Sequence, residues 1–125
     1  MAEKSEIAAL FDRWNAALQT QDAAQVAALY APDAVLLPTV SNEVRRTPEA
    51  VTDYFEHFLR KRPRGHVIQS NIRVFGDIAI DSGVYCFALT TDQVTSEVTC
   101  RYSFVYRKGD EGWRIIEHHS SVMPE

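Results

Sequence analysis

The chain of 125 residues has the length of one ordinary domain, and its content of 46% hydrophobic and 24% charged residues is typical of globular rather than disordered proteins. The net charge of -4 provides no basic surface for phosphates, so we expect no nucleic-acid partner. No stretch approaches the roughly 18 apolar residues of a membrane span, and the N-terminal residues lack the pattern of a signal peptide. We therefore expect one domain over residues 1–125, in the cytoplasm and without a membrane partner.

The first part of the chain has the periodicity of two helices. The apolar residues of the first helix recur at spacings of three and four and share one face: Ile7, Leu10, Phe11, Trp14 and Leu18. Ser5 can cap this helix. Asp22 and Gln25 have the spacing of a capping box, which predicts a short second helix that ends at Ala31-Pro32. Its apolar face consists of Val26, Leu29 and Tyr30.

A small hairpin and a third helix are predicted next. The apolar run 34–37 is followed by a polar turn at 41–42 and a return strand through Val44 and Arg45. Thr47 then caps a helix with Pro48 at its first position. The buried stripe of this helix is rich in aromatic residues: Val51, Tyr54, Phe55, Phe58 and Leu59. We expect Trp14 of the first helix to pack against Phe55 and Phe58.

The remaining sequence has the pattern of four antiparallel strands. They cover residues 67–75, 78–90, 94–107 and 113–122, and turn sequences separate them. Three helices followed by four strands predict an α+β fold in which the helices cover one face of a bent antiparallel sheet. Alternation along residues 84–89 and 101–106 leaves neither sheet face purely polar. A partner subunit or a ligand is therefore expected to cover the second face.

No common catalytic motif is present, because the sequence lacks HExxH, a Walker loop, GxGxxG after a strand, CxxC and GxSxG. The candidates for chemistry are polar residues within apolar strands. Arg101 could bind a carboxylate through its forked guanidinium, or it could pair with an internal acidic residue. Arg45 allows the same two interpretations. Catalytic residues therefore remain unassigned.

His118 and His119 are adjacent in a predicted strand, so their rings point to opposite faces of the sheet and only one of them can line a pocket. Adjacent strand residues cannot ligate one ion from the same face, and we expect neither a metal nor another cofactor. One packed and one exposed histidine is the plain alternative to a binding role. Cys86 and Cys100 both lie in predicted strands, where a disulfide is possible but not needed.

Several short sequences, in this order, resemble the nuclear transport factor 2-like (SnoaL-like) superfamily. They are Leu29-Tyr30-Ala31-Pro32-Asp33-Ala34, Asn42-Glu43-Val44-Arg45, Tyr54-Phe55-Glu56, Phe75-Gly76-Asp77 and Gly112-Trp113-Arg114-Ile115-Ile116. Within the superfamily the chain is most similar to bacterial stand-alone relatives of the association (hub) domain of calcium/calmodulin-dependent protein kinase II. The resemblance implies a cone-like fold, assembly through the sheet and a pocket whose arginines hold a small carboxylate. Calmodulin binding is not supported by these residues.

The resemblance also shows a departure, because the pocket arginines of the kinase hub fall near Cys86, Ser103 and Ser120 here. Our hypothesis is a homo-oligomeric domain, homodimer or larger ring, with a cationic pocket for a small organic acid and no demonstrable catalysis. The alternatives are a small isomerase, cyclase or hydrolase of the SnoaL or ketosteroid isomerase type, and a purely structural association module. The expected ligand-binding residues are Arg45, Tyr54, Arg101, His118, His119 and Ser121. The expected pocket-lining residues are Trp14, Tyr30, Phe55 and Phe58.

Overall fold

The computed structural model describes residues 3–39 and 41–124. The helices are α1 (Lys4–Gln19), α2 (Ala23–Ala27) and α3 (Pro48–Phe58), and a 3-10 turn, η1 (Leu59–Lys61), extends α3. The strands are β1 (Tyr30–Leu37), β2 (Arg64–Phe75), β3 (Ile78–Thr91), β4 (Val94–Gly109) and β5 (Gly112–Val122). The predicted α+β class is confirmed, and the four long strands lie within a few residues of their predicted bounds.

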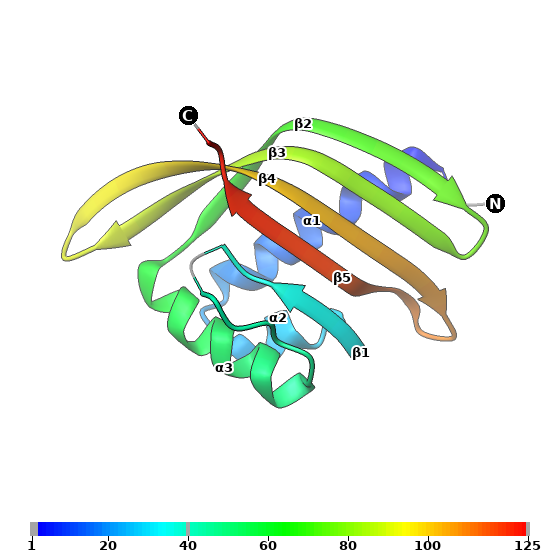
Figure 1. The fold of residues 1–125 in the computed structure, drawn as a ribbon, viewed down its shortest axis with the longest axis horizontal. Coiled ribbons are helices and arrows are strands. Elements are labelled where there is room, and N and C mark those ends of the chain that lie inside the picture. The colour runs from blue at the N-terminus through cyan, green and yellow to red at the C-terminus, as the bar shows by residue number, and fades with distance from the viewer. Residues whose placement is uncertain (1–2, 40, 125) are drawn as a thin grey trace.

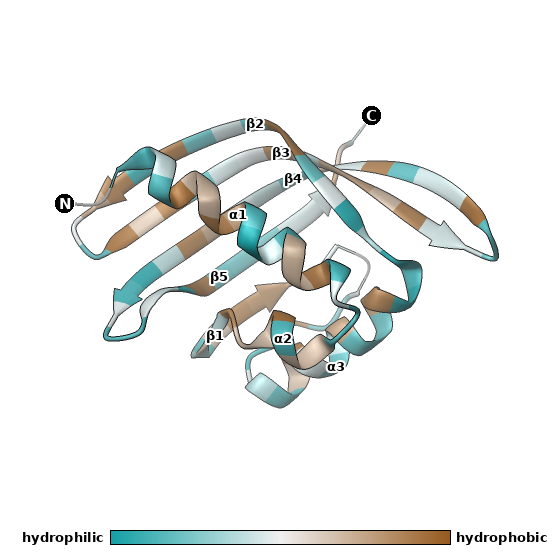
Figure 2. Cartoon of the chain, turned by 180° about the vertical axis from the view of Figure 1, so that it is seen from behind, coloured by the Kyte–Doolittle hydropathy of each residue, from teal (hydrophilic) through white to brown (hydrophobic). Residues whose placement is uncertain are grey.

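The strands form one sheet in the order β1-β5-β4-β3-β2. Strands β2 to β5 are antiparallel neighbours, whereas β1 joins the edge beside β5 in parallel. Figure 1 shows the strands in front of α1, and Figure 2, seen from behind, shows α1 crossing the opposite face. Among the described residues no helix covers the face that is nearer the viewer in Figure 1, which we call the outer face.

Two of the three predicted helix starts are confirmed by their caps. The Thr47 side chain accepts a hydrogen bond from the Ala50 backbone, with Pro48 in the first turn of α3. The Asp22 side chain caps α2 through the Ala24 backbone N–H. The prediction for α1 was wrong by two residues, because Glu3 occupies the N-cap position and Ser5 lies inside the helix. Glu3 forms no side-chain cap, so the start of α1 is fixed by packing of its apolar face.

The segment after α2 differs from the prediction. The helix ends at Ala27, and Tyr30 opens β1 instead of completing an apolar helix face. The Ile115 backbone N–H donates to the Leu29 carbonyl at 2.9 Å, so pairing with β5 determines the conformation here. Pro32 is tolerated because β1 is an edge strand. The predicted hairpin return is reduced to one antiparallel bridge between Leu36 and Arg45.

Aromatic side chains between α1, α3 and the sheet form the core. The Trp14 ring lies 6.5 Å from the Phe55 ring and 5.4 Å from the Phe104 ring, measured between centroids. The expected packing of α1 on α3 through Trp14 is thus confirmed. Buried residues of α1, α3 and the strands belong to one hydrophobic cluster, and Figure 2 shows hydrophobic positions along α1 and along the strands that it crosses. The core therefore packs α1 and α3 against the inner face of the sheet.

Candidate functional site

A cavity of about 30 Å³ lies between the helices and the inner face of the sheet. Its lining comes from α1, α3, the end of β1 and strands β3, β4 and β5: Trp14, Leu36, Pro38, Thr39, Tyr54, Phe55, Phe58, Tyr85, Phe87, Leu89, Val98, Cys100, His118 and Ser120. Of the expected pocket residues, Trp14, Tyr54, Phe55, Phe58 and His118 line it. Tyr30 does not, although it contacts His118 from behind.

His118 connects two tyrosines at the floor of this cavity. Its side chain is buried, because strand alternation in β5 turns it inward. The Nδ1 atom lies 2.8 Å from the Tyr30 hydroxyl, and the Nε2 atom lies 3.2 Å from the Tyr85 hydroxyl. The indole N–H of Trp14 donates to the Tyr30 hydroxyl oxygen at 3.2 Å. A continuous chain of hydrogen bonds thus runs from α1 through β1 and β5 to β3.

The first member of this chain sets the direction of all the others. An indole can only donate, so Tyr30 accepts from Trp14 and keeps its single proton for another acceptor. That acceptor is Nδ1 of His118, which leaves the imidazole proton on Nε2. His118 then donates to the Tyr85 hydroxyl oxygen. Each of these four side chains then has at least one hydrogen-bond partner, as buried polar groups in folded proteins normally have.

Burial keeps the side chains of His118 and Tyr85 uncharged at neutral pH. Loss of solvation, with a smaller contribution from the neighbouring His119, lowers the pKa of His118 to about 3. Loss of solvation also raises the pKa of Tyr85 well above its ordinary value. The imidazole ring stacks on Phe104 with 4.0 Å between centroids, which leaves no room for solvent on that side. His118 is therefore neutral at this pH and forms hydrogen bonds as an uncharged imidazole.

A second pair of hydrogen-bonded side chains, Thr39 and Ser120, lies at the cavity wall. The Thr39 hydroxyl donates to the Ser120 hydroxyl, and both residues line the cavity. Cys100 lies beside them as a buried free thiol whose pKa is raised by loss of solvation. Cys86 is also a free thiol, and it faces the other side of the sheet. The two cysteines thus cannot form a disulfide with each other without rearranging the strands.

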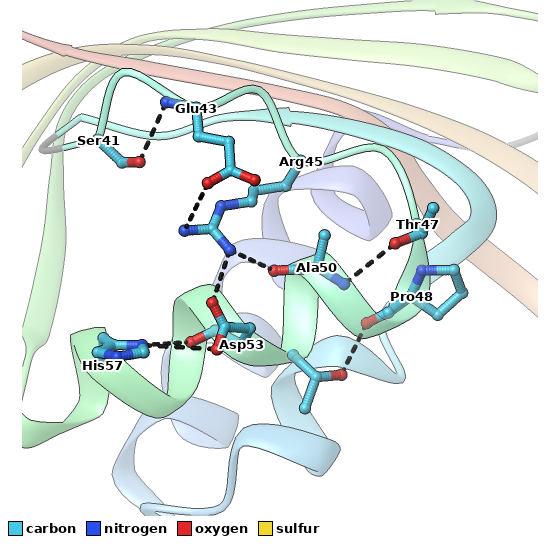
Figure 3. A network of polar contacts seen from close by, with 9 residues as sticks. Ser41, Glu43, Arg45, Thr47, Pro48, Ala50, Asp53 and His57 are labelled. Carbon is cyan, nitrogen blue, oxygen red and sulfur yellow. Dashed lines mark hydrogen bonds and ion pairs between the residues drawn. The ribbon is translucent and has the colours of Figure 1, made fainter.

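Arg45 lies beside the cavity but does not line it. Its guanidinium pairs with Asp53 at 2.8 Å and lies 5.9 Å from the centre of the Tyr54 ring. Figure 3 shows this group at the start of α3, where Arg45 also donates to the Ala50 carbonyl. Glu43 is a further, longer partner at 3.8 Å. The internal carboxylates thus take up the charge of Arg45, which was one of the two interpretations open from the sequence.

Three expected ligand-binding residues lie on the outer face of the sheet, namely Arg101, His119 and Ser121. Arg101 is exposed and pairs in register with Ser121, and His119 is exposed and pairs with Ser103. The expectation that Arg101 reaches into the cavity does not agree with this position. The physical reason is the two-residue period of a strand, since the buried Tyr102 turns its neighbour Arg101 outward. Tyr54 and His118 alone, of the six expected binding residues, meet in the cavity.

Local sequence patterns gave no signal that Tyr85, Thr39, Cys100 or Ser120 belong to a site. The alternation along residues 84–89 and 101–106 showed that neither face of the sheet is purely polar, but it gave no reason to separate cavity residues from core residues. Thr39 follows the end of β1, whose pairing with β5 was not predicted. That parallel pairing is what brings Thr39 to Ser120 across 81 positions of sequence.

The cone of helices over a bent sheet, with a cavity floor of aromatic and neutral polar groups, defines a nuclear transport factor 2-like fold. The chain is similar over its whole length to a Xanthomonas campestris protein named as a calcium/calmodulin dependent protein kinase II association domain. The two share 54% sequence identity with a TM-score of 0.97, and the match covers 91% of that chain. A nuclear transport factor 2-like protein from Salmonella enterica shares only 19% identity, with a TM-score of 0.82 and 98% and 92% of the two chains covered.

The family model of the calcium/calmodulin dependent protein kinase II association domain matches residues 3–124. The chain belongs to this family. A nuclear transport factor 2-like protein with a cystatin-like fold from Novosphingobium aromaticivorans also matches, at 14% identity and a TM-score of 0.81, over 97% of this chain and 82% of that one. A comparison with curated proteins found no match. Across residues 3–39 and 41–124, no helix is long and apolar enough to cross a membrane.

Proposed function

We propose that this protein is a self-associating domain that joins copies of itself through the outer face of its sheet and binds a small molecule in its cavity. The observation that carries the proposal is the sheet itself, since α1 covers one face and no described helix covers the other (Figure 1). The name of the family and of the Xanthomonas campestris relative, an association domain, supports self-association. Copies of one chain meet most simply through a self-complementary surface.

The centre of the outer face is weakly polar. Ile80 and Val105 pair across β3 and β4, and Ser82 pairs with Ser103 in the next outward row. Each of these side chains is only partly exposed, although no helix packs on them. Short and apolar side chains in neighbouring rows allow two sheets to approach face to face at about 10 Å. This surface is therefore suited to packing against a second copy.

Charges of both signs surround this centre. Arg101 and Arg73 are exposed on outward-facing positions of β4 and β2, and Glu117 is exposed on β5 beside Val105. A two-fold interface brings the same patch of each copy together, so arginines of one copy can meet glutamates of the other. The mixture of signs favours a second copy of this chain over a strongly acidic or basic partner.

The cavity supports binding rather than proton-transfer catalysis. An isomerase or cyclase of the alternative hypothesis needs a base within hydrogen-bond reach of the substrate. No Asp or Glu among the described residues lines the cavity. The basic nitrogen of His118 already accepts from Tyr30, and the raised pKa of Tyr85 keeps its hydroxyl protonated, so neither group serves as a base at neutral pH. The cavity thus offers binding groups without a partner for proton abstraction.

Self-association is tested by the mass of the protein in solution. We expect light scattering after size exclusion to give at least twice the 14.2 kDa of one chain, independent of micromolar dilution. Val105→Glu places a charge in the centre of the outer face and should reduce the mass to that of one chain. Val94→Glu, at a position 67% exposed in the β3–β4 hairpin, is the matched control and should not change the mass.

A wild-type protein that stays at one chain mass at all concentrations would overturn the self-association proposal. An unchanged oligomer in Val105→Glu would overturn the assignment to the outer face. Far-UV circular dichroism and chemical denaturation of both variants show whether the fold is retained. If Val105→Glu unfolds, Ser103→Arg, a partly exposed position in the same patch, replaces it and should have the same effect on mass.

A further inference from the structure

The direction of the hydrogen-bond chain has a consequence for what the cavity can bind, on the basis of the small-molecule role proposed above. The chain begins at Trp14, which only donates, and each following group passes on one proton. A linear chain of this kind ends with one unused donor. Here it ends at the hydroxyl of Tyr85, next to the paired hydroxyls of Thr39 and Ser120.

The group that carries the unused proton lines the cavity, whichever group it is. If Tyr85 donates to Ser120, the surplus proton moves to the Thr39–Ser120 pair or to the Cys100 thiol beside it; if it does not, the proton stays on Tyr85. All four residues line the cavity. Among the described residues the Tyr85 hydroxyl has two partners, the Nε2 atom of His118, which donates to it, and the Ser120 hydroxyl. A ligand atom that accepts a hydrogen bond would therefore complete the chain.

The charge of the cavity excludes one large class of acceptors. A carboxylate loses its hydration on entering a buried site and needs a cation or several donors in return. None of the arginines or lysines of the described chain lines the cavity, and His118 is neutral. Arg45, the nearest candidate, is held by Asp53 outside the lining. A neutral acceptor such as a carbonyl oxygen does not have this desolvation cost.

The walls select for an apolar body with one polar end. The rings of Trp14, Phe55 and Phe87 contribute apolar surface to the lining. A volume of about 30 Å³ holds roughly two water molecules, so a ligand must displace water and widen the cavity at its partly exposed side. The partly exposed lining residues are Thr39, Phe58, Leu89 and Val98. A small molecule with few heavy atoms meets these limits.

We propose that the cavity is a site for a small, uncharged molecule with an apolar body and a single carbonyl-type acceptor, which receives the unused hydrogen bond of Tyr85, Ser120, Thr39 or Cys100. When an amide and a carboxylate have the same shape, the site binds the uncharged amide more tightly. The ligand class therefore differs from the organic acids that an arginine-lined pocket takes, and charge is the property that separates the two.

The experiment uses two pairs of isosteric probes, isobutyramide against isobutyrate and benzamide against benzoate, at pH 7. The two tryptophans provide the readout, because each indole N–H gives a separate NMR signal. The Trp14 indole N–H lies in the chain behind the cavity, whereas that of Trp113 donates to Glu6 at 2.7 Å, away from it. We expect at least one amide to shift the Trp14 signal at millimolar concentration and its carboxylate to shift it at least tenfold more weakly.

Variants test the donor. Tyr85→Phe keeps the ring and removes the hydroxyl, and should weaken amide binding by up to about tenfold. Tyr106→Phe is the matched control, since this buried hydroxyl of β4 has no partner among the described residues and does not line the cavity. If Tyr85→Phe does not fold, Ser120→Ala replaces it as a milder removal of a cavity hydroxyl, with a weaker loss in the same direction.

Each result decides between the two proposals. A carboxylate that binds as tightly as its amide, with the Trp14 signal as reporter, overturns the uncharged ligand class and leaves small-molecule binding in place. Amide binding unaffected by both Tyr85→Phe and Ser120→Ala overturns the role of the unused donor. If none of the four probes moves the Trp14 signal, the small-molecule function of the cavity is itself overturned.

Discussion

The Nδ1 atom of His118 lies 2.8 Å from the hydroxyl of Tyr30, although 88 positions separate the two residues in the sequence. The contact exists because β1 runs parallel to β5 and places its first residue beside the buried imidazole. Parallel pairing between an early and a late segment is a non-local feature of this fold. It determines the protonation of His118 and, through it, the polarity of the cavity.

We predict that stability falls as the pH is lowered from 7 to 5. The pKa of His118 is about 3 in the folded protein and about 6.5 when unfolded, so between these values the unfolded chain binds more protons. The stabilisation is complete above pH 6.5 and is lost as pH falls towards 3, by at most about 1.4 kcal/mol per pH unit. Urea denaturation at pH 7, 6 and 5 measures this slope. His118→Gln should flatten it, whereas His119→Gln, at an exposed position, should not.

Two tyrosines on the inner face of β4 should respond in opposite ways to removal of the hydroxyl. The Tyr102 hydroxyl donates to the buried Asp81 carboxyl at 2.8 Å, so Tyr102→Phe leaves that oxygen short of a donor and should cost about 1–3 kcal/mol. Tyr106→Phe removes a buried hydroxyl without a partner among the described residues, and should be neutral or slightly stabilising. Chemical denaturation of both variants measures the difference, and equal losses would contradict it.

The contact between α1 and α3 should be a major source of stability. Phe55 is 1% exposed and packs edge to face on Trp14, so Phe55→Ala should cost about 3–5 kcal/mol in the free energy of unfolding. Phe75→Ala serves as the control, because Phe75 is 58% exposed at the end of β2. A loss below about 1 kcal/mol for Phe55→Ala would mean that α3 contributes little to the core.

Gly83 should not accept any side chain. A Cβ atom there would lie 2.0 Å from the Gln69 carbonyl oxygen, at the bulge where β2 changes register against β3. Gly83→Ala must displace backbone rather than a flexible side chain, and we expect a loss of about 1–3 kcal/mol or more. Gly109→Ala meets nothing within 4 Å and provides the comparison. Thermal unfolding of the two variants side by side tests this, and similar melting temperatures would refute it.

Much of the fold could be predicted from the sequence because its signals are local. The cap at Thr47, the stripe of α3 and the two-residue alternation of β3 and β4 depend only on neighbouring residues, and the structure confirms all three. The same alternation implied that His118 and His119 face opposite sides of the sheet. It could not say which of them is buried, because that depends on how β5 pairs with β4.

The site depended on contacts that local patterns do not contain. Arg101 was expected in the cavity because an arginine within an apolar strand suggests a buried partner, but the outer face of this sheet is uncovered and the arginine remains in solvent. Tyr30 resembled the end of an apolar helix face until its pairing with β5 made it a strand residue. The sequence by itself determined most of the helices and strands and the alternation of side chains along each strand. Only the tertiary structure decided which polar groups meet, since their free energy depends on burial and on partners up to about 100 residues away.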